Sequence, residues 1–220
     1  MVFPNAYSGV KKLYAGEILQ LIGAILIGIV VILGLGAVNA DAAGALTEEE
    51  AGGMALGILM AFVPALLLLL VGEILVLVGL HQAGKDEPRY MKKGFWAAII
   101  MIIVTTAMGA VSGNGGAQNL AASFLSCLAE ILSLFVFLYS IQGVMELAQR
   151  LGREDLVSRG KTIMVVLIVG IAASAVASIA ATTLGSVASV ASVVALIALV
   201  LAYVLFLSYL SKAKRMLAGR

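Results

Sequence analysis

The chain has 220 residues, of which 62% are hydrophobic and only 12% are charged, with a net charge of +2. Because ordinary soluble domains are about one quarter charged, this composition excludes a conventional soluble domain. A single cysteine, Cys127, excludes a disulfide within the chain and a multi-cysteine metal site. We therefore expect one membrane domain that covers residues 1–220 and leaves no room for a separate soluble domain.

Six apolar stretches are each long enough to cross a bilayer as a helix, which takes about 20 residues. The first stretch could also be a secretory signal, since Lys11 and Lys12 precede it and small residues follow at 38–40. Its length favours a full span. The sequence therefore predicts an all-α, polytopic membrane protein. The expected spans are 17–38, 54–80, 95–111, 120–142, 162–184 and 187–210.

The basic residues fall on one side of this scheme. Every Lys and Arg lies in a terminal segment or in the loops that follow the second and fourth spans. The other three loops have no basic residue, and the first of them carries Glu48, Glu49 and Glu50. Basic residues near span ends are retained in the cytoplasm. We therefore expect a multi-pass protein of the cell membrane with both termini cytoplasmic.

The inner ends of the even-numbered spans resemble one another. The segments Leu80–Ala83, Met145–Ala148 and Leu210–Ala213 end three spans in a similar way. We interpret the chain as three helical hairpins, formed by spans one–two, three–four and five–six. True repeats of this kind would be related by an axis along the membrane normal. Convergent composition at cytoplasmic helix ends is the alternative interpretation.

The loops and the C-terminal segment contain short charged motifs that allow a comparison with other membrane proteins. The stretch Gly84–Glu87, its counterpart Gly152–Asp155 and the Lys212–Lys214 ending accompany the basic inner loops. In this combination the chain resembles small uncharacterised six-helix membrane proteins of bacteria and archaea. That resemblance implies a membrane bundle and implies no activity.

Two carboxylates lie inside expected spans without a basic residue at their depth. Glu130 falls near the middle of the fourth span, and Glu73 lies about 10 Å from the inner end of the second. Asn119, Ser123 and Ser126 lie within about 60° of Glu130 on the same helix face. Such a carboxylate needs a proton, hydrogen bonds, a cation or water. These five residues form the predicted proton or cation site; a protonated Glu hydrogen-bonded between helices is the alternative.

The remaining carboxylates suggest simpler roles. Glu17 stands at the inner edge of the first span, where the helix dipole favours an acid. Asp86, Glu87, Glu154 and Asp155 lie in the inner loops beside basic residues. We expect these four to be solvated charges.

Small residues recur at intervals of four in the second and fifth spans. Small residues at this spacing let helix backbones approach closely, which drives helix association in lipid. We predict that these two helices lie centrally or at a contact with a second copy or a membrane partner protein. The residues are Gly57, Ala61, Ala65, Ala173, Ala177 and Ala181.

The sequence contains little that would support catalysis. His81 is the only histidine and lies at the inner end of the second span, far along the chain from Cys127. A metal site needs clustered His, Cys or carboxylates, so we expect no enzyme, metal or cofactor. The loops are too short for a nucleic-acid domain, which leaves the lipid bilayer as the expected surrounding. Two functions remain: a small transporter, channel or carrier subunit, or a structural or accessory protein without a transported substrate.

Overall fold

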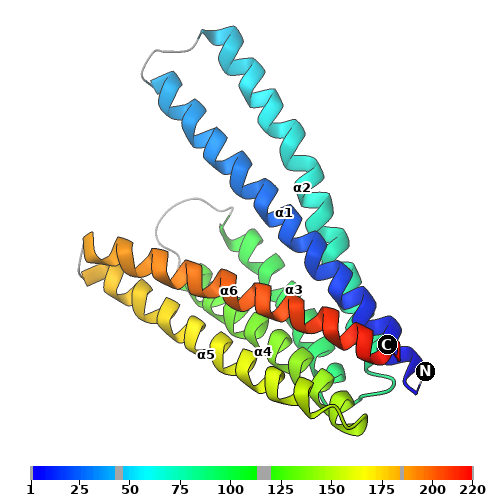
Figure 1. The fold of residues 1–220 in the computed structure, drawn as a ribbon. Helices are drawn as coiled ribbons and strands as arrows, with labels where there is room; N and C mark the ends of the chain where they lie inside the picture. Colours follow the sequence, from blue (N-terminus) through cyan, green and yellow to red (C-terminus); the bar gives the residue numbers. More distant parts are fainter. Residues whose placement is uncertain (1, 43–46, 113–119, 184–185, 220) are drawn as a thin grey trace. The chain divides into compact units, whose positions relative to one another are not determined.

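The computed structural model describes residues 2–42, 47–112, 120–183 and 186–219, and these ranges contain α-helices and no strand (Figure 1). The predicted all-α class is confirmed, and the expected spans fall one to a helix. The helices are α1 (Pro4–Ala42), α2 (Glu48–Ala83), α3 (Met91–Ser112), α4 (Leu120–Arg150), α5 (Glu154–Thr183) and α6 (Ser186–Leu217).

The chain divides into two compact units. The large unit consists of residues 1–11 and 79–220, and the small unit consists of residues 12–78. The large unit therefore holds α3 to α6 together with the first residues of α1 and the last residues of α2. The small unit holds the rest of α1 and α2.

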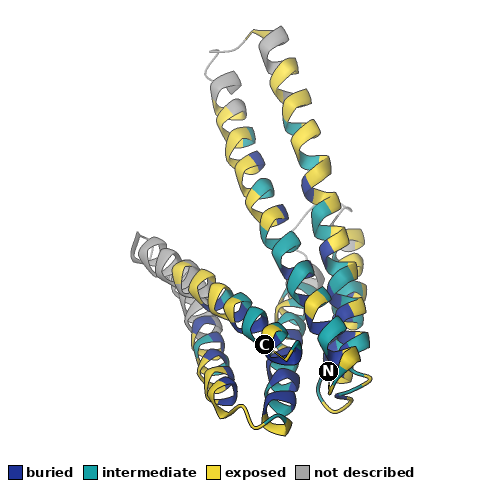
Figure 2. Cartoon of the chain, turned by 45° about the vertical axis from the view of Figure 1, so that its right-hand side comes forward, coloured by how far each residue is buried: buried dark blue, intermediate teal, exposed yellow. Residues whose placement is uncertain are grey.

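Within the large unit, consecutive helices pack against each other. Helix α3 packs on α4 and α5 packs on α6, while α4 also contacts α5 and α6. Figure 2 shows that burial concentrates where short loops join the helices. Large side chains that are fully buried there are Leu80, Met91, Ile141, Leu147, Leu156, Phe206, Tyr209 and Leu210.

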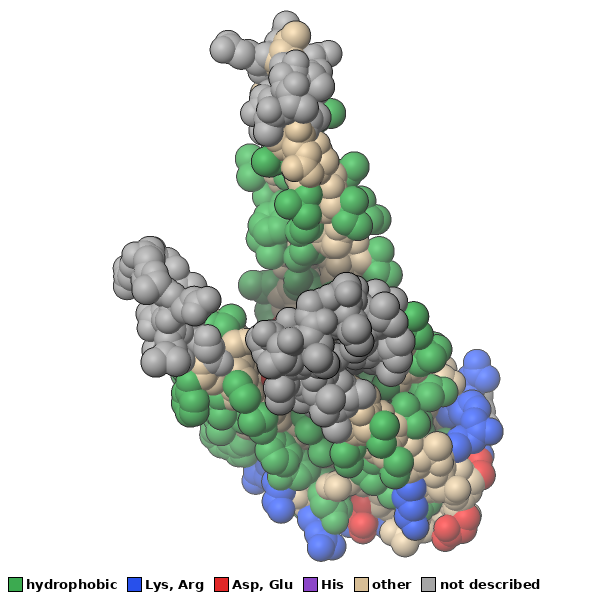
Figure 3. Space-filling model, turned by 90° about the vertical axis from the view of Figure 1, so that its left-hand side faces the viewer, with side chains coloured by type: hydrophobic (Ala, Val, Ile, Leu, Met, Phe, Trp, Pro, Cys, Tyr) green, Lys and Arg blue, Asp and Glu red, His purple; other side chains and the backbone are tan. Residues whose placement is uncertain are grey.

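Apolar side chains cover much of the remaining surface. Large side chains such as Ile32, 71% exposed, and Phe124, 68% exposed, face outward. In the large unit, charged side chains gather at one end and hydrophobic ones cover the helices beyond it (Figure 3). Four helices of the described part are long and apolar enough to cross a membrane. These segments, which fit a membrane protein, are Pro4–Gly36, Gly52–Ala83, Met91–Ala110 and Phe124–Arg150.

The loop between α2 and α3 buries a carboxylate. Glu87 is 0% exposed. Its Oε2 accepts hydrogen bonds of 2.9 Å from the backbone N–H groups of Tyr90 and Met91, and its Oε1 accepts one of 3.1 Å from Arg89. These are N–H groups that the start of a helix leaves without a partner. The prediction that Glu87 is a solvated charge was wrong, because Glu87 caps α3.

The neighbouring carboxylate of this loop caps a different helix. Asp86 Oδ2 accepts a hydrogen bond of 2.8 Å from the backbone N–H of Ala6, and Oδ1 accepts one of 2.9 Å from Asn5 Nδ2. Asp86 is therefore bound to the first turn of α1 while its side chain stays partly exposed. Glu154 and Asp155 are exposed in the first turn of α5, as predicted.

Candidate functional site

In the small unit, helices α1 and α2 pack closely at glycine positions, where the glycine adds no side chain between their backbones. A Cβ atom added to Gly16 would lie 2.6 Å from the carbonyl oxygen of Gly72. A Cβ atom added to Gly23 would lie 3.1 Å from the carbonyl oxygen of Ala65. At Gly16 a side chain would meet backbone, so glycine allows the close contact there, whereas at Gly23 the nearest atoms to an added Cβ belong to the Leu69 side chain. We call this line of contacts the glycine seam.

The glycine seam follows a spacing of seven residues, which is two helical turns. Gly9, in the large unit, makes the same kind of contact, since its added Cβ would lie 2.5 Å from the carbonyl oxygen of Gly79. The sequence prediction looked for small residues at intervals of four and overlooked this pattern. The residues with the seven-residue spacing are Gly9, Gly16 and Gly23 on α1, and Ala65, Gly72 and Gly79 on α2.

The small residues that were predicted to pack between helices differ in their surroundings. Ala65 is 0% exposed and lies at the glycine seam. Gly57 and Ala61 are exposed, and a Cβ atom added to Gly57 meets nothing within 4 Å. Their contact with another helix or subunit stays a prediction. The side chains of Ala173, Ala177 and Ala181 lie outside the described part of α5.

A hydrogen-bonded pair of polar side chains adjoins the seam. Gln20 Nε2 on α1 donates a hydrogen bond of 2.6 Å to Glu73 Oε2 on α2. The residue before Glu73 is Gly72, where an added Cβ would lie 2.7 Å from Gln20 Cγ. The missing side chain at Gly72 therefore makes the space in which Gln20 reaches Glu73.

The second oxygen of Glu73 has a different environment. Glu73 Oε1 is buried and has no hydrogen-bond partner among the described residues. The described part of the chain also places no Lys or Arg in an ion pair with Glu73. A buried polar atom without a partner is costly, and an ionised carboxylate without one is more so. The pair is therefore suited to take up a proton or a cation.

The surroundings of Glu73 limit which cation would fit. In the described ranges, no group of three or more His, Cys, Asp or Glu side chains is placed to hold a metal ion. One carboxylate beside the Gln20 side-chain amide offers a single negative charge. That set of oxygens matches a proton or a monovalent cation better than a transition metal.

Glu130, the other predicted site carboxylate, belongs to the large unit. Its side chain is exposed on α4, and Ser126 is partly exposed one turn away. Neither makes a hydrogen bond or ion pair with another described residue. Asn119 and the side chain of Ser123 lie outside the described part. The predicted grouping of these residues therefore stays a prediction.

No protein-family model, curated protein or solved structure matches this chain. Function has to be argued from the chemistry of the site.

Two further polar residues stand near the expected inner ends of spans. Glu17 is 3% exposed and lies inside α1, which begins at Pro4, so its expected placement at a helix start was wrong. His81 is exposed and its ring lies 5.2 Å from that of Phe95, centroid to centroid. Neither residue belongs to the Gln20–Glu73 pair.

The residue that the sequence analysis missed is Gln20. It is separated from Glu73 by 53 positions, so helix periodicity within one span does not connect them. The sequence does show that Gln20 is a polar residue within the first apolar stretch, between Gly16 and Gly23. This is the feature that could have indicated its role. Pairing the glycines of the two spans at seven-residue intervals would have brought Gln20 beside Glu73.

Proposed function

We propose that the protein is a small transporter, channel or carrier subunit that binds protons or monovalent cations at Glu73 and Gln20. It crosses the membrane six times, as three hairpins, with both termini in the cytoplasm. The observation that carries the proposal is the buried Oε1 atom of Glu73, which lacks a partner among the described residues while Oε2 is held by Gln20 at 2.6 Å.

The Gln20 amide suits a carboxyl group that changes its protonation state. An amide has both a donor and an acceptor end. Its NH₂ group stabilises the ionised form of Glu73, and its carbonyl oxygen, after rotation of the amide, accepts from the protonated form. Gln20 therefore satisfies one carboxyl oxygen in either state. The second oxygen is then the position at which a proton or a cation is exchanged.

The depth of Glu73 fits exchange with the inner solution. Seven residues separate it from Leu80, about 10 Å along the helix axis. An intramembrane carboxylate normally faces protein or water and marks an ion pathway. Leu80 ends the second expected span on its cytoplasmic side, so the inner solution is the nearer of the two to Glu73 in the proposed topology.

Glu130 is the second carboxylate of the proposal. A charged group at the bilayer centre costs about 2.5 kcal/mol or more on insertion scales. Its exposed side chain therefore faces a neighbouring helix, a second copy or water in this proposal. In the proposed function Glu130, with Ser126 one turn away, is a separate proton or cation site within the large unit.

Reconstituted vesicles test this function. The protein is placed in vesicles that contain a pH-sensitive dye, and a K⁺ diffusion potential drives flux of H⁺ or Na⁺. We expect Glu73→Gln to remove the flux while keeping the helical circular dichroism spectrum. Glu154→Gln, which changes an exposed carboxylate of α5, serves as the matched control and keeps it. Wild-type flux in Glu73→Gln would contradict the proposal.

A second function is favoured by the open face around Gly57. Gly52, Gly53 and Gly57 each have nothing within 4 Å of an added Cβ, and Ala61 is exposed beside them. In this alternative the protein is a structural or accessory component whose small residues pack on a membrane partner. Gly57→Leu would then disrupt an assembly seen by cross-linking, whereas Glu73→Gln would have no effect on it.

A further inference from the structure

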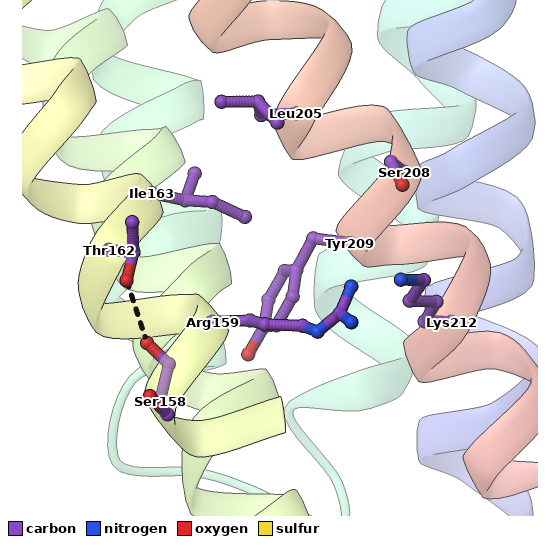
Figure 4. Close-up of a pocket in the computed structure, with 8 residues that line it drawn as sticks. All are labelled: Ser158, Arg159, Thr162, Ile163, Leu205, Ser208, Tyr209 and Lys212. Atoms are coloured by element: carbon purple, nitrogen blue, oxygen red, sulfur yellow. Dashed lines mark hydrogen bonds between the residues drawn. The ribbon is translucent and has the colours of Figure 1, made fainter. Parts of the chain in front are cut away.

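A pocket opens between α5 and α6 in the large unit, at the end where charged residues gather. Its volume is about 180 Å³ (Figure 4). Arg159 and Ser158 line it from α5, and Tyr209 and Lys212 line it from α6. This pocket belongs to different helices from the Gln20–Glu73 pair and is argued independently of the proposed function.

Two positive charges face each other across the pocket. Figure 4 shows the guanidinium group of Arg159 and the ammonium group of Lys212 pointing toward one another from the two helices. Neither forms an ion pair with another described residue. The acidic residues nearest to Arg159 in sequence are Glu154 and Asp155; both are exposed, and neither lines the pocket. Two like charges held together favour an anion between them.

A buried hydroxyl in the pocket wall lacks a partner. Tyr209 is 2% exposed, and its hydroxyl oxygen is buried without a hydrogen-bond partner among the described residues. The hydroxyl lies against bare backbone, since a Cβ atom added to Gly160 would approach it to 2.9 Å. Figure 4 shows this hydroxyl pointing toward α5 and away from Lys212, so the Tyr209 ring forms a wall of the pocket while its hydroxyl is closed off from it.

The rest of the lining divides into a polar and an apolar end. Ser158 and Ser208 are exposed and carry hydroxyl groups, whereas the Thr162 hydroxyl already donates to the Ser158 carbonyl oxygen at 3.2 Å. Ile163 and Leu205 lie further along the helices, away from the charged end (Figure 4). A ligand that bears an anionic group and an apolar part would match both ends.

We propose that this pocket binds a phosphate group, either free phosphate or the headgroup of an anionic lipid. Arg159 and Lys212 neutralise the phosphate charge, and the exposed hydroxyl groups of Ser158 and Ser208 lie at the same pocket. Arg binds phosphate with two parallel N–H groups and Lys binds it as a point charge. Ile163 and Leu205 contact the first carbons of an acyl chain when the phosphate belongs to a lipid.

Binding to the full chain in neutral detergent tests the proposal. Native mass spectrometry measures the affinity for dioctanoyl phosphatidic acid, for dioctanoylglycerol, which lacks the phosphate, and for inorganic phosphate. We expect saturable binding of the phosphatidic acid and none of dioctanoylglycerol. Displacement by millimolar inorganic phosphate would identify a free-phosphate site, and resistance to displacement would identify a lipid headgroup site. Absence of phosphatidic acid and phosphate binding would overturn the proposal.

Matched variants separate the pocket from general surface charge. Arg159→Gln and Lys212→Gln are each expected to weaken binding about tenfold or more. Tyr209→Phe removes only the buried hydroxyl and is expected to change affinity less than about twofold. Lys161→Gln removes an exposed charge of α5 that does not line the pocket, and is expected to change affinity less than about twofold. Equal losses in Lys161→Gln and Arg159→Gln would overturn the proposal. Arg159 is exposed, so its substitution tests binding even where Tyr209→Phe impairs folding.

Discussion

The loop between α2 and α3 holds a fully buried carboxylate, Glu87, and the helix pair α1 and α2 holds a half-buried one, Glu73, whose Oε1 atom is buried. In the loop, Glu87 receives three backbone hydrogen bonds, shared between both of its oxygens. In the helix pair, Glu73 receives one hydrogen bond, from Gln20, and its Oε1 atom has no partner among the described residues.

The contrast follows from where each residue stands on a helix. The first N–H groups of a helix have no acceptor within it, so a carboxylate placed there is satisfied by backbone alone. Within a helix, every backbone N–H already donates to the carbonyl four residues before it. The hydrogen-bond donor to Glu73 therefore comes from a side chain of the facing helix, Gln20. A buried carboxylate at the start of a helix has its hydrogen bonds supplied by the backbone. One inside a helix lacks these donors, so a proton, a bound ion or a functional role has to account for it.

The largest expected effect is on the loop. Glu87→Ala leaves three N–H groups at the start of α3 without their acceptor and should lower the free energy of unfolding by about 2 kcal/mol or more. Denaturant unfolding in detergent micelles measures the change. Glu154→Ala, at an exposed site in the first turn of α5, is the control and should shift stability by less than about 0.5 kcal/mol. Equal losses in the two variants would refute the capping role.

The next effect concerns the glycine seam. Gly16→Ala places a methyl group 2.6 Å from the Gly72 carbonyl oxygen, so the helices must separate. We expect a loss of about 1–3 kcal/mol. Gly57→Ala adds the same methyl group where nothing lies within 4 Å, and should be neutral or slightly stabilising. Unfolding of both variants under one condition gives the comparison, and equal stabilities would argue against the seam.

A smaller effect is expected when the polar pair is removed altogether. The double variant Gln20→Met, Glu73→Met replaces the pair with apolar side chains of similar size. Such replacements are often neutral or stabilising, so we expect stability within about 1 kcal/mol of wild type, together with loss of flux. The same assays of unfolding and vesicle flux apply. A large loss of stability would mean that Glu73, like Glu87, is a structural carboxylate.

The smallest effect is expected at an exposed carboxylate. The Arg153 side chain donates hydrogen bonds to Asp155, and this lowers the pKa of Asp155 below its ordinary value of 3.8. A lowered pKa stabilises the fold above pH 3.8, and this contribution is lost as the pH falls through the folded-state value. The difference in unfolding midpoint between wild type and Asp155→Asn should be small near neutral pH and shrink further in acid. A difference that grows in acid would contradict this sign.

The helices could be predicted from the sequence because an apolar stretch of about 20 residues has few alternatives. Their inner ends could not, since α1 begins at Pro4, well before the expected span. The capping by Glu87 was missed because it depends on how a short loop turns. The sequence indicated Glu73 as a site residue but not its partner Gln20, because Gln20 lies on another helix. For Glu130, periodicity placed Ser126 on the same face without indicating what that face contacts.

The central claim is that Glu73 exchanges a proton or cation, and infrared difference spectroscopy tests it most directly. The carboxyl band assigned by subtracting Glu73→Gln is recorded in lipid vesicles while the bath pH and Na⁺ concentration are varied. We predict that this band changes reversibly with pH or with Na⁺. A band that stays constant across the whole accessible range would show a sealed structural hydrogen bond and would contradict the proposed function.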